Sequence, residues 1–463
     1  MAHHIEGSRN SCALHGALQV VEAIEGGVPV IHSNAGCGAQ HFFGVNRLNA
    51  GGDRFGGPPV SSSNISEKHV VFGGSSRLRE QLKNTVKIVD GDLYVIVTGC
   101  STEMVGDDIP AMAKEGRDQD FQVIYANTPG FRGDVHQGYQ LAVKALIEQL
   151  PDLGKADKAP VEGLVNIWGI IPHQDPFWAG NLEEIGRLLE GIGLKANILF
   201  GYGQGVPEWN RVPDALLNIV VSVWGEAPAL LLEERYGTPV LTVEGLPVGA
   251  AAGRYLRKIS ERLELDTTET ESFINKEEKR LNTYLAGLAD TYYRAGFQRE
   301  FALIGESSQV VGISDFLAGT LGLIPRTLII TDNPPEYARE ALVTRLTGII
   351  EGDRTEVFFS EDLAEITDLV RSGGAELVLG SALEEDVAAE LGVPFLQLSF
   401  PLSDRVVLNR SYAGYRGAAT LLEDLGSAIL SENYNTKILH SRVRHGGFDS
   451  HKQRHADSVV HAV

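Results

Sequence analysis

The sequence of 463 residues contains few cysteines, and Cys12, Cys37 and Cys100 are all that it has. A small, odd number argues against a disulfide framework and fits a reducing compartment. Each cysteine lies beside glycines or other small residues, at a point where a strand or helix is expected to end. Such turns bring the backbone close to a bulky group, so the thiolates are candidate ligands of a soft metal or an iron–sulfur cluster. Three thiolates are one short of a closed four-thiolate site, so the remaining ligands must come from a partner chain, an unusual cluster or solvent.

Positive charge is also scarce, because 40 lysines and arginines face 61 aspartates and glutamates, for a net charge of −21. This balance excludes nucleic acid as the main partner, since binding to phosphates requires clustered basic residues. It would instead steer a basic docking partner toward the protein. The sequence has no run apolar enough to span a membrane, and its first residues lack the apolar core of a secretory signal. We therefore expect a cytoplasmic protein with no membrane partner.

Short β-branched runs alternate with glycine turns and helical segments along the whole chain, which predicts an α/β protein with doubly wound parallel sheets. The length suits two to three domains, and the pattern favours three. A long charged helix is expected near 268–294, and the polar tail from about Ser431 shows no periodicity. The expected divisions are a first domain with the three cysteines (1–155), a second (156–300), a third (301–405) and a C-terminal helix and tail (406–463) that packs on a partner or on the first domain.

Several motifs together make the sequence recognisable. They are CALHGA from Cys12, NAGC ending at Cys37, TGCSTEMVGDD around Cys100, NTPGF up to Phe131, and FPLSDRVVLNRSYAGYRGA over 400–418. The combination resembles component 1 of nitrogenases and nitrogenase-like reductases, and within it the beta-type subunit. The resemblance extends over nearly the whole chain.

The resemblance implies a role for each cysteine. Cys12, Cys37 and Cys100 match the three cysteines by which beta-type subunits hold half of an eight-iron P-type cluster, [8Fe-7S], at the interface with an alpha-type partner. The implied assembly is an α2β2 oxidoreductase that receives electrons from an ATP-hydrolysing iron protein. The active-site cofactor is then expected in the alpha-type partner, because this chain has no fourth cysteine. No catalytic residue is expected here.

Three departures from the family pattern bear on the substrate. The usual serine after the proline of the TPSF motif is replaced by Gly130, which offers no side-chain ligand. The segment before Cys12 is short, which is closer to the molybdenum-free types, and the stretch from His41 to Ser63 is unlike the usual beta chain. These departures favour a methylthio-alkane reductase, which cleaves carbon–sulfur bonds. The alternatives are a vanadium- or iron-only nitrogenase beta chain, and a cofactor-assembly scaffold with a [4Fe-4S] cluster at the same interface.

Ionisable residues near the cysteines have simpler explanations than metal binding. Glu103, Asp107 and Asp108 follow Cys100 closely, and carboxylates at the start of a helix favour capping. His15 is interpreted as an ordinary, partly buried histidine, with a hydrogen bond near the cluster as the alternative. His32 is expected to support the ligands rather than to bind metal.

Backbone N–H groups are the expected hydrogen-bond donors around the cluster, because hydrogen bonds to the sulfurs help set its potential. Glycines beside the cysteines allow this approach most readily. The candidates are Gly36, Gly38 and Gly99.

Overall fold

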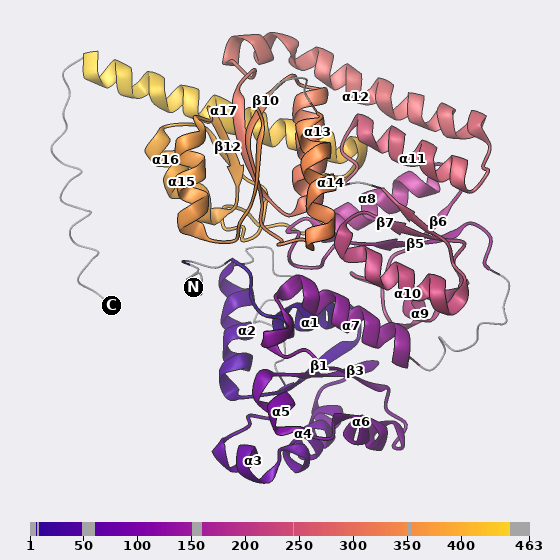
Figure 1. Ribbon diagram of the computed structural model, residues 1–463. Coiled ribbons are helices and arrows are strands. Elements are labelled where there is room, and N and C mark those ends of the chain that lie inside the picture. The colour runs from indigo at the N-terminus through magenta and orange to yellow at the C-terminus, as the bar shows by residue number, and fades with distance from the viewer. Residues whose placement is uncertain are drawn as a thin grey trace.

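The computed structural model describes residues 6, 9–48, 61–150, 160–243, 245–349 and 354–444, with the side chains of 43–48 and 433–444 left out. It contains three parallel sheets, each flanked by helices (Figure 1). The predicted class of three doubly wound α/β units is confirmed.

The first sheet carries the cysteine-bearing loops and has the strand order β2-β1-β3-β4. Its strands are β1 (Gly27–His32), β2 (Ser61–Ser62), β3 (Leu93–Thr98) and β4 (Val123–Ala126). Its helices are α1 (Ala13–Glu22), α2 (Ala35–Leu48), α3 (Glu67–Phe72), α4 (Ser75–Ile88), α5 (Cys100–Val105), α6 (Ile109–Arg117) and α7 (Val135–Gln149).

Alternation along β3 explains why both faces of this sheet are covered. Leu93, Val95 and Val97 belong to the apolar cluster that includes α1 and α7, whereas Tyr94 and Ile96 belong to the cluster of α4 and α6. Successive side chains of a strand point to opposite faces, so a continuously buried run requires helices on both sides. In Figure 1, α1 and α7 lie between this sheet and the rest of the chain.

The second sheet has the order β6-β5-β7-β8, and the third has the order β11-β10-β9-β12-β13. The second unit comprises β5 (Leu164–Trp168), α8 (Trp178–Glu190), β6 (Lys195–Asn197), α9 (Val206–Asn210), β7 (Leu217–Val220), α10 (Glu226–Tyr236), β8 (Val240–Thr242), α11 (Ala250–Arg262) and α12 (Thr267–Ala295). The third comprises β9 (Glu300–Gly305), α13 (Ser307–Gly319), β10 (Ile324–Ile330), α14 (Glu336–Thr347), β11 (Glu356–Phe359), α15 (Leu363–Gly373), β12 (Leu377–Gly380), α16 (Glu385–Leu391), β13 (Phe395–Gln397) and α17 (Gly414–Arg444).

The three units share one apolar core. A single cluster of buried side chains includes Leu18 of α1, Trp168 of β5 and Phe316 of α13. Burying this much apolar surface between sheets fixes their relative placement. The domain boundaries given above stay a prediction.

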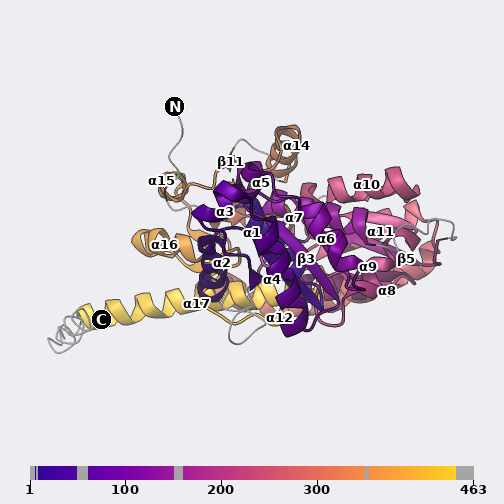
Figure 2. The same ribbon diagram turned by 90° about the horizontal axis from the view of Figure 1, so that it is seen from below.

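One element differs from the sequence-based expectation. Helix α17 continues through Ser431 to Arg444, where a tail without periodicity was expected. Hydrophobic periodicity fades there because the residues are polar, but no proline or glycine interrupts 427–444. The helix packs on α8, α11, α12 and β13, and Figure 2 shows its C-terminal end projecting from the body. Among the described residues, no helix is long and apolar enough to cross a membrane.

The segment before α1 is attached to the third unit. Arg9 forms a buried ion pair with Glu384 and a hydrogen bond to Ser381 Oγ at 3.4 Å. Asn10 donates from its side-chain amide to the carbonyl oxygen of Thr331, at the end of β10, over 2.8 Å. The position of Cys12 therefore depends on a sheet that is more than 300 residues away in the sequence.

A buried polar junction joins the three units around His136. Its Nε2 lies 3.0 Å from Glu306 Oε1, its Nδ1 lies 3.2 Å from Asp134 Oδ1, and its ring stacks on Trp224 at 5.0 Å. Trp224 donates in turn to Asp332 over 2.8 Å. Burial lowers the pKa of His136, but the two carboxylates outweigh it and raise this pKa to about 10. Burial raises the pKa of Glu306 to about 7, against the opposing effect of His136, and we assign the shared proton to the imidazole because Asp134 also faces the ring.

Removing the charge at this junction should destabilise the fold. We expect His136→Leu to lower the free energy of unfolding by about 3–5 kcal/mol, because two carboxylates are left without their buried partner. The folded pKa of His136 is above its ordinary value of 6.5, so its contribution is full below pH 6.5 and disappears as the pH rises through about 10.

Chemical denaturation across this pH range measures the effect. His136→Gln is the matched control, because it keeps a donor without the titrating charge, so the stability difference from wild type should shrink toward pH 10. A difference that stays constant with pH would contradict the assignment.

Candidate functional site

The three cysteines stand at the N-terminal ends of three different helices. Cys12 is the N-cap of α1, Cys37 lies in the first turn of α2, and Cys100 is the first residue of α5. Helices α2 and α5 follow the neighbouring parallel strands β1 and β3, whose last residues, His32 and Thr98, are paired. Helix N-termini carry partial positive charge and free N–H groups, so this arrangement favours thiolates and other anionic sulfur.

The structure brings Cys12 and Cys100 together beside Gly130, and Cys37 is near enough to act on the thiol of Cys12. A Cβ placed on Gly130 would lie 3.1 Å from the Cβ of Cys12, and 3.3 Å from the sulfurs of both Cys12 and Cys100. All three cysteines are free, Cys12 and Cys37 are partly buried, and Cys100 is exposed. Burial raises the pKa of the Cys12 thiol, the N–H groups of His15 and Leu14 lower it, and the other two thiols raise it further.

Each sulfur has at least one hydrogen-bonding neighbour. The Gly130 N–H donates to Cys100 Sγ over 3.1 Å, and Ser33 Oγ donates to Cys37 Sγ over 3.2 Å. His15 Nδ1 lies 3.2 Å from Cys12 Sγ. The sequence pointed to other donors, and Gly130 and Ser33 were missed because neither is within two residues of the cysteine that it serves.

Gly99 has a different role from the one expected. Its N–H donates to the carbonyl oxygen of His32 over 3.0 Å rather than to sulfur. A Cβ on Gly99 would lie 2.0 Å from Ser33 Oγ, so only glycine allows the loops after β1 and β3 to approach this closely. No bond from the N–H of Gly36 or Gly38 to a sulfur is present among the described residues.

His15 is more than the ordinary histidine that the sequence favoured. It is 4% exposed, and its ring lies 5.8 Å from that of His41, centroid to centroid. Burial, followed by the neighbouring His41, lowers the pKa of His15 to about 4. The ring contacts the Cys12 sulfur directly, as the alternative interpretation had it.

Helix α7 holds Cys12 through its close contact with α1. A Cβ on Gly16 would lie 2.0 Å from the carbonyl oxygen of Val135, and one on Gly138 would lie 2.1 Å from that of Ala13. The two backbones therefore touch at glycines. Directly before the helices, Cys12 forms an antiparallel bridge with Asp134. These contacts fix Cys12 relative to the turn that contains Gly130.

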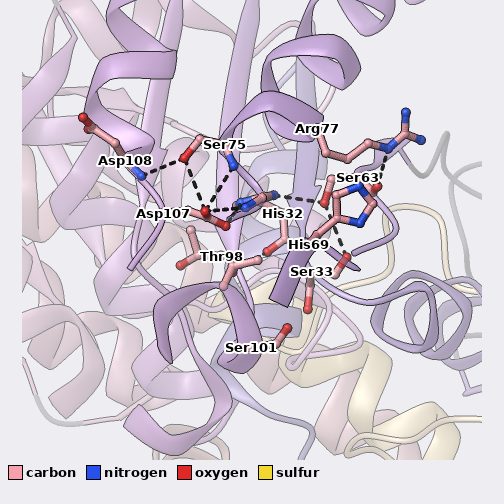
Figure 3. Close-up of polar contacts among 12 residues, drawn as sticks. His32, Ser33, Ser63, His69, Ser75, Arg77, Thr98, Ser101, Asp107 and Asp108 are labelled. Atoms are coloured by element: carbon pink, nitrogen blue, oxygen red, sulfur yellow. Dashed lines mark hydrogen bonds and ion pairs between the residues drawn. The ribbon is translucent and has the colours of Figure 1, made fainter. Parts of the chain in front are cut away.

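His32 joins the loops through its contacts with Ser63 and Asp107, as Figure 3 shows. Its ring is fully buried, with Nδ1 3.0 Å from Ser63 Oγ and Nε2 3.0 Å from Asp107 Oδ2. Its carbonyl oxygen accepts from Gly99 and from Thr102 Oγ1 in α5. Burial lowers the pKa of His32, although Asp107 opposes this effect. The predicted supporting role agrees with this geometry, since His32 contacts no sulfur.

The carboxylates after Cys100 cap helices and bond to their neighbours. Asp108 Oδ1 accepts from the N–H of Ala111 over 3.0 Å at the start of α6. Asp107 caps a different helix from the one expected, because its Oδ1 accepts from the N–H of Gly74 at 2.6 Å and of Ser75 at 3.1 Å, at the start of α4. Glu103 accepts a hydrogen bond from Thr98 Oγ1.

The donors of the site are three free thiols. Cys12 and Cys100 meet beside Gly130, and Cys100 is exposed. In the described parts of the chain, no three histidine, cysteine, aspartate or glutamate side chains gather closely enough to hold one metal ion. Soft thiolates at helix N-termini are the donors that iron–sulfur clusters use.

Large apolar side chains are exposed on the elements around Cys100. Met104 (81% exposed) lies on α5 and Phe131 (64%) follows Gly130, while Val71 (72%) and Phe72 (81%) lie on α3, which contacts α5. Exposed apolar surface of this kind favours a protein interface.

Comparison with known proteins agrees with the predicted family. The chain is 28% identical to the nitrogenase molybdenum-iron protein beta chain of Methanothermobacter marburgensis, covering 92% of this chain and 94% of the relative. It is 26% identical to the nitrogenase vanadium-iron protein beta chain of Trichormus variabilis, covering 91% and 93%. A solved structure, "Nitrogenase Cp1 at pH 6.5", has the same fold, with a TM-score of 0.77 at 21% identity over 93% of this chain and 94% of that one.

The family described as nitrogenase component 1 type oxidoreductase matches residues 12–430, from the first cysteine to helix α17. The beta-type resemblance and the oxidoreductase class are confirmed by these matches, and identities of 23–28% among the relatives fit a divergent sequence. The chain belongs to the nitrogenase component 1 family and resembles its beta chains.

Proposed function

We propose that this chain is the beta-type subunit of a nitrogenase-like reductase and holds half of an interfacial [8Fe-7S] cluster through Cys12, Cys37 and Cys100. The observation that carries the proposal is that the free thiols of Cys12 and Cys100 meet beside Gly130, while Cys37, in the first turn of α2, is near enough to act on Cys12. The cluster would relay single electrons from an ATP-hydrolysing iron protein to the active-site cofactor. An α2β2 assembly follows from the same family.

The residues of this chain would bind and orient the cluster and shield its sulfurs. The thiols must lose their protons to bind iron, and helix N-termini favour the anionic form. Ser33 Oγ and the Gly130 N–H then donate to Cys37 and Cys100, which stabilises negative charge on those sulfurs.

The alpha-type partner would cover the exposed side of the site. Cys100 is exposed, and Met104 and Phe131 beside it expose most of their apolar surface. A second subunit that supplies three thiolates would bury this surface while closing the cluster. Burial of such side chains contributes about 25 cal/mol per Å² to association.

For the substrate, we propose small methylthio-alkanes, whose carbon–sulfur bond would be cleaved reductively in the alpha-type partner. The supporting observation is Gly130, which stands where the resemblance expects a serine and offers no oxygen ligand. The unusual stretch after Cys37 lies mostly outside the described residues. A cluster with a changed reduction potential would suit a reaction that needs fewer electrons, or a different potential, than dinitrogen reduction.

The likeness to a vanadium-iron beta chain supports the second candidate, a dinitrogen-reducing enzyme. The short segment before Cys12 does not distinguish molybdenum-free types from molybdenum types, because the alignment with a molybdenum-iron beta chain covers 94% of that relative. A cofactor-assembly scaffold with a [4Fe-4S] cluster is the third outcome that the experiments below distinguish.

Loss of any one thiol should disable the relay. We expect Cys12→Ala, Cys37→Ala or Cys100→Ala to remove or rearrange the interfacial cluster. Electron delivery should then fall below about one hundredth of the wild-type rate, because loss of even a hydrogen-bond partner of a metal ligand lowers metal affinity or activity by about 10–100-fold. Iron per αβ pair, electron paramagnetic resonance and turnover with the iron protein measure this. Ser101→Ala is the control, because its hydroxyl donates to Asn34 rather than to sulfur. Full iron and full activity in Cys100→Ala would refute the ligand assignment.

Any side chain at position 130 should lower iron occupancy and stability. In Gly130→Ala the new methyl group would stand 3.1–3.3 Å from atoms of Cys12 and Cys100, so the cysteines must move by a few tenths of an ångström. We expect lower iron occupancy and a stability loss of about 1–3 kcal/mol, typical of overpacking. In the control Gly36→Ala, nothing lies within 4 Å of the added Cβ, so iron content should be normal. Equal iron in the two variants would contradict this role.

The substrate is tested by product analysis. The purified complex with its iron protein and ATP should release methanethiol and a small hydrocarbon from a methylthio-alkane, while ammonia formation under dinitrogen is slow or absent. Gas chromatography and an ammonia assay measure the two, with the Cys100→Ala complex as the blank. Vigorous ammonia formation without thiol release would favour the nitrogenase alternative. Neither product, together with four irons at the interface and cofactor transferable to another apo-enzyme, would favour the scaffold.

A further inference from the structure

His15 is the one side-chain nitrogen that contacts a site sulfur among the described residues. Its Nδ1 lies 3.2 Å from Cys12 Sγ, within the range of a hydrogen bond to sulfur. Cys12 is the N-cap of α1 and His15 lies in its first turn, where the N–H groups of His15 and Gly16 donate to the Cys12 carbonyl oxygen. The helix therefore sets the distance from the ring to the sulfur.

The ring is held in place by its surroundings. His15 is 4% exposed and packs beside the ring of His41 at 5.8 Å. His41 is itself anchored, because its Nε2 lies 2.8 Å from Glu22 Oε1. Glu22 ends α1, so one helix and its buried neighbour confine the imidazole. A buried side chain with this little freedom keeps its hydrogen bond at low entropic cost.

The direction of the hydrogen bond follows from the chemistry of the sulfur. A cysteine that ligates iron has lost its proton and can only accept, so the hydrogen between Cys12 Sγ and His15 Nδ1 must belong to the nitrogen. Hydrogen bonds to cluster sulfurs withdraw electron density and stabilise the reduced state.

We propose that His15 is a positioning residue that tunes the interfacial cluster, donating from Nδ1 to Cys12 Sγ and raising the reduction potential. The inference rests on the proposed function, since it requires Cys12 to be a ligand. It adds a donor of a third kind to the site. Cys100 accepts from a backbone N–H and Cys37 from a serine hydroxyl. Cys12 has the ring of His15 in addition to the N–H groups of His15 and Leu14, and mutation can exchange the ring without touching the backbone.

The test is a mediated redox titration of the purified complex, followed by electron paramagnetic resonance. His15→Leu removes the donor and should shift the reduction equilibrium of the cluster toward the oxidised state by about tenfold, which is 59 mV for one electron. His15→Asn places an amide N–H where Nδ1 stands and should restore most of the shift. Ser101→Ala is the control, because its hydroxyl donates to Asn34 and not to a sulfur or to His15, so its potential should match the wild type.

Iron per αβ pair separates the outcomes. Unchanged iron with a lowered potential in His15→Leu and recovery in His15→Asn is the expected result. An unchanged potential in His15→Leu with full iron would overturn the proposal, and so would loss of iron in both variants, because His15 would then only maintain the structure. If Cys12→Ala keeps all its iron, the ligand assignment of the proposed function fails instead.

Discussion

The site depends on how closely the loops after β1 and β3 can approach each other. Ser33 and Gly99 meet where a methyl group would stand 2.0 Å from the serine oxygen, so a side chain at Gly99 would push the loops apart. The same contact leaves Ser33 Oγ free to reach Cys37 and puts the N-terminus of α5 beside that of α2. His32 secures the arrangement, since its carbonyl oxygen accepts from both Gly99 and Thr102. Thiolates repel one another because they carry like charges. The helix N-termini at the three cysteines offset this repulsion, because their partial positive charge stabilises the anionic form.

Apolar contacts and polar contacts stabilise different aspects of the site. Apolar burial fixes how the sheets stack, but it is non-directional and cannot place a sulfur to within an ångström. Directional contacts do so here: Asp107 joins the start of α4 to His32, and His136 joins α7 to the third unit. These buried groups are each paired with a partner of opposite or complementary character, which is the condition under which burial of charge is tolerated.

The sequence alone predicted the fold class and the cysteine set, because parallel strands leave continuous β-branched runs and the family motifs surround the thiols. It did not predict which atoms contact the sulfurs. Ser33 and Gly130 reach their cysteines only when strand ends meet at one sheet edge, and such proximity has no signal in local spacing. Asp107 was expected to cap the helix that follows it, yet it caps α4, because the fold offered nearer N–H groups. The end of α17 was missed since polar residues carry no periodicity.

The attachment of Arg9 and Asn10 to the third unit has a consequence for how the protein is made. Cys12 leaves the ribosome first, yet the groups that hold the segment before it, the Thr331 carbonyl and Glu384, are synthesised more than 300 residues later. Domains generally fold in order as they emerge. The contacts of α1 with α7 can thus place Cys12 while the chain is still growing, whereas the segment before it is anchored only when the last sheet has formed. In a truncated chain the three cysteines could still meet, but the residues directly before Cys12 would lack their anchor.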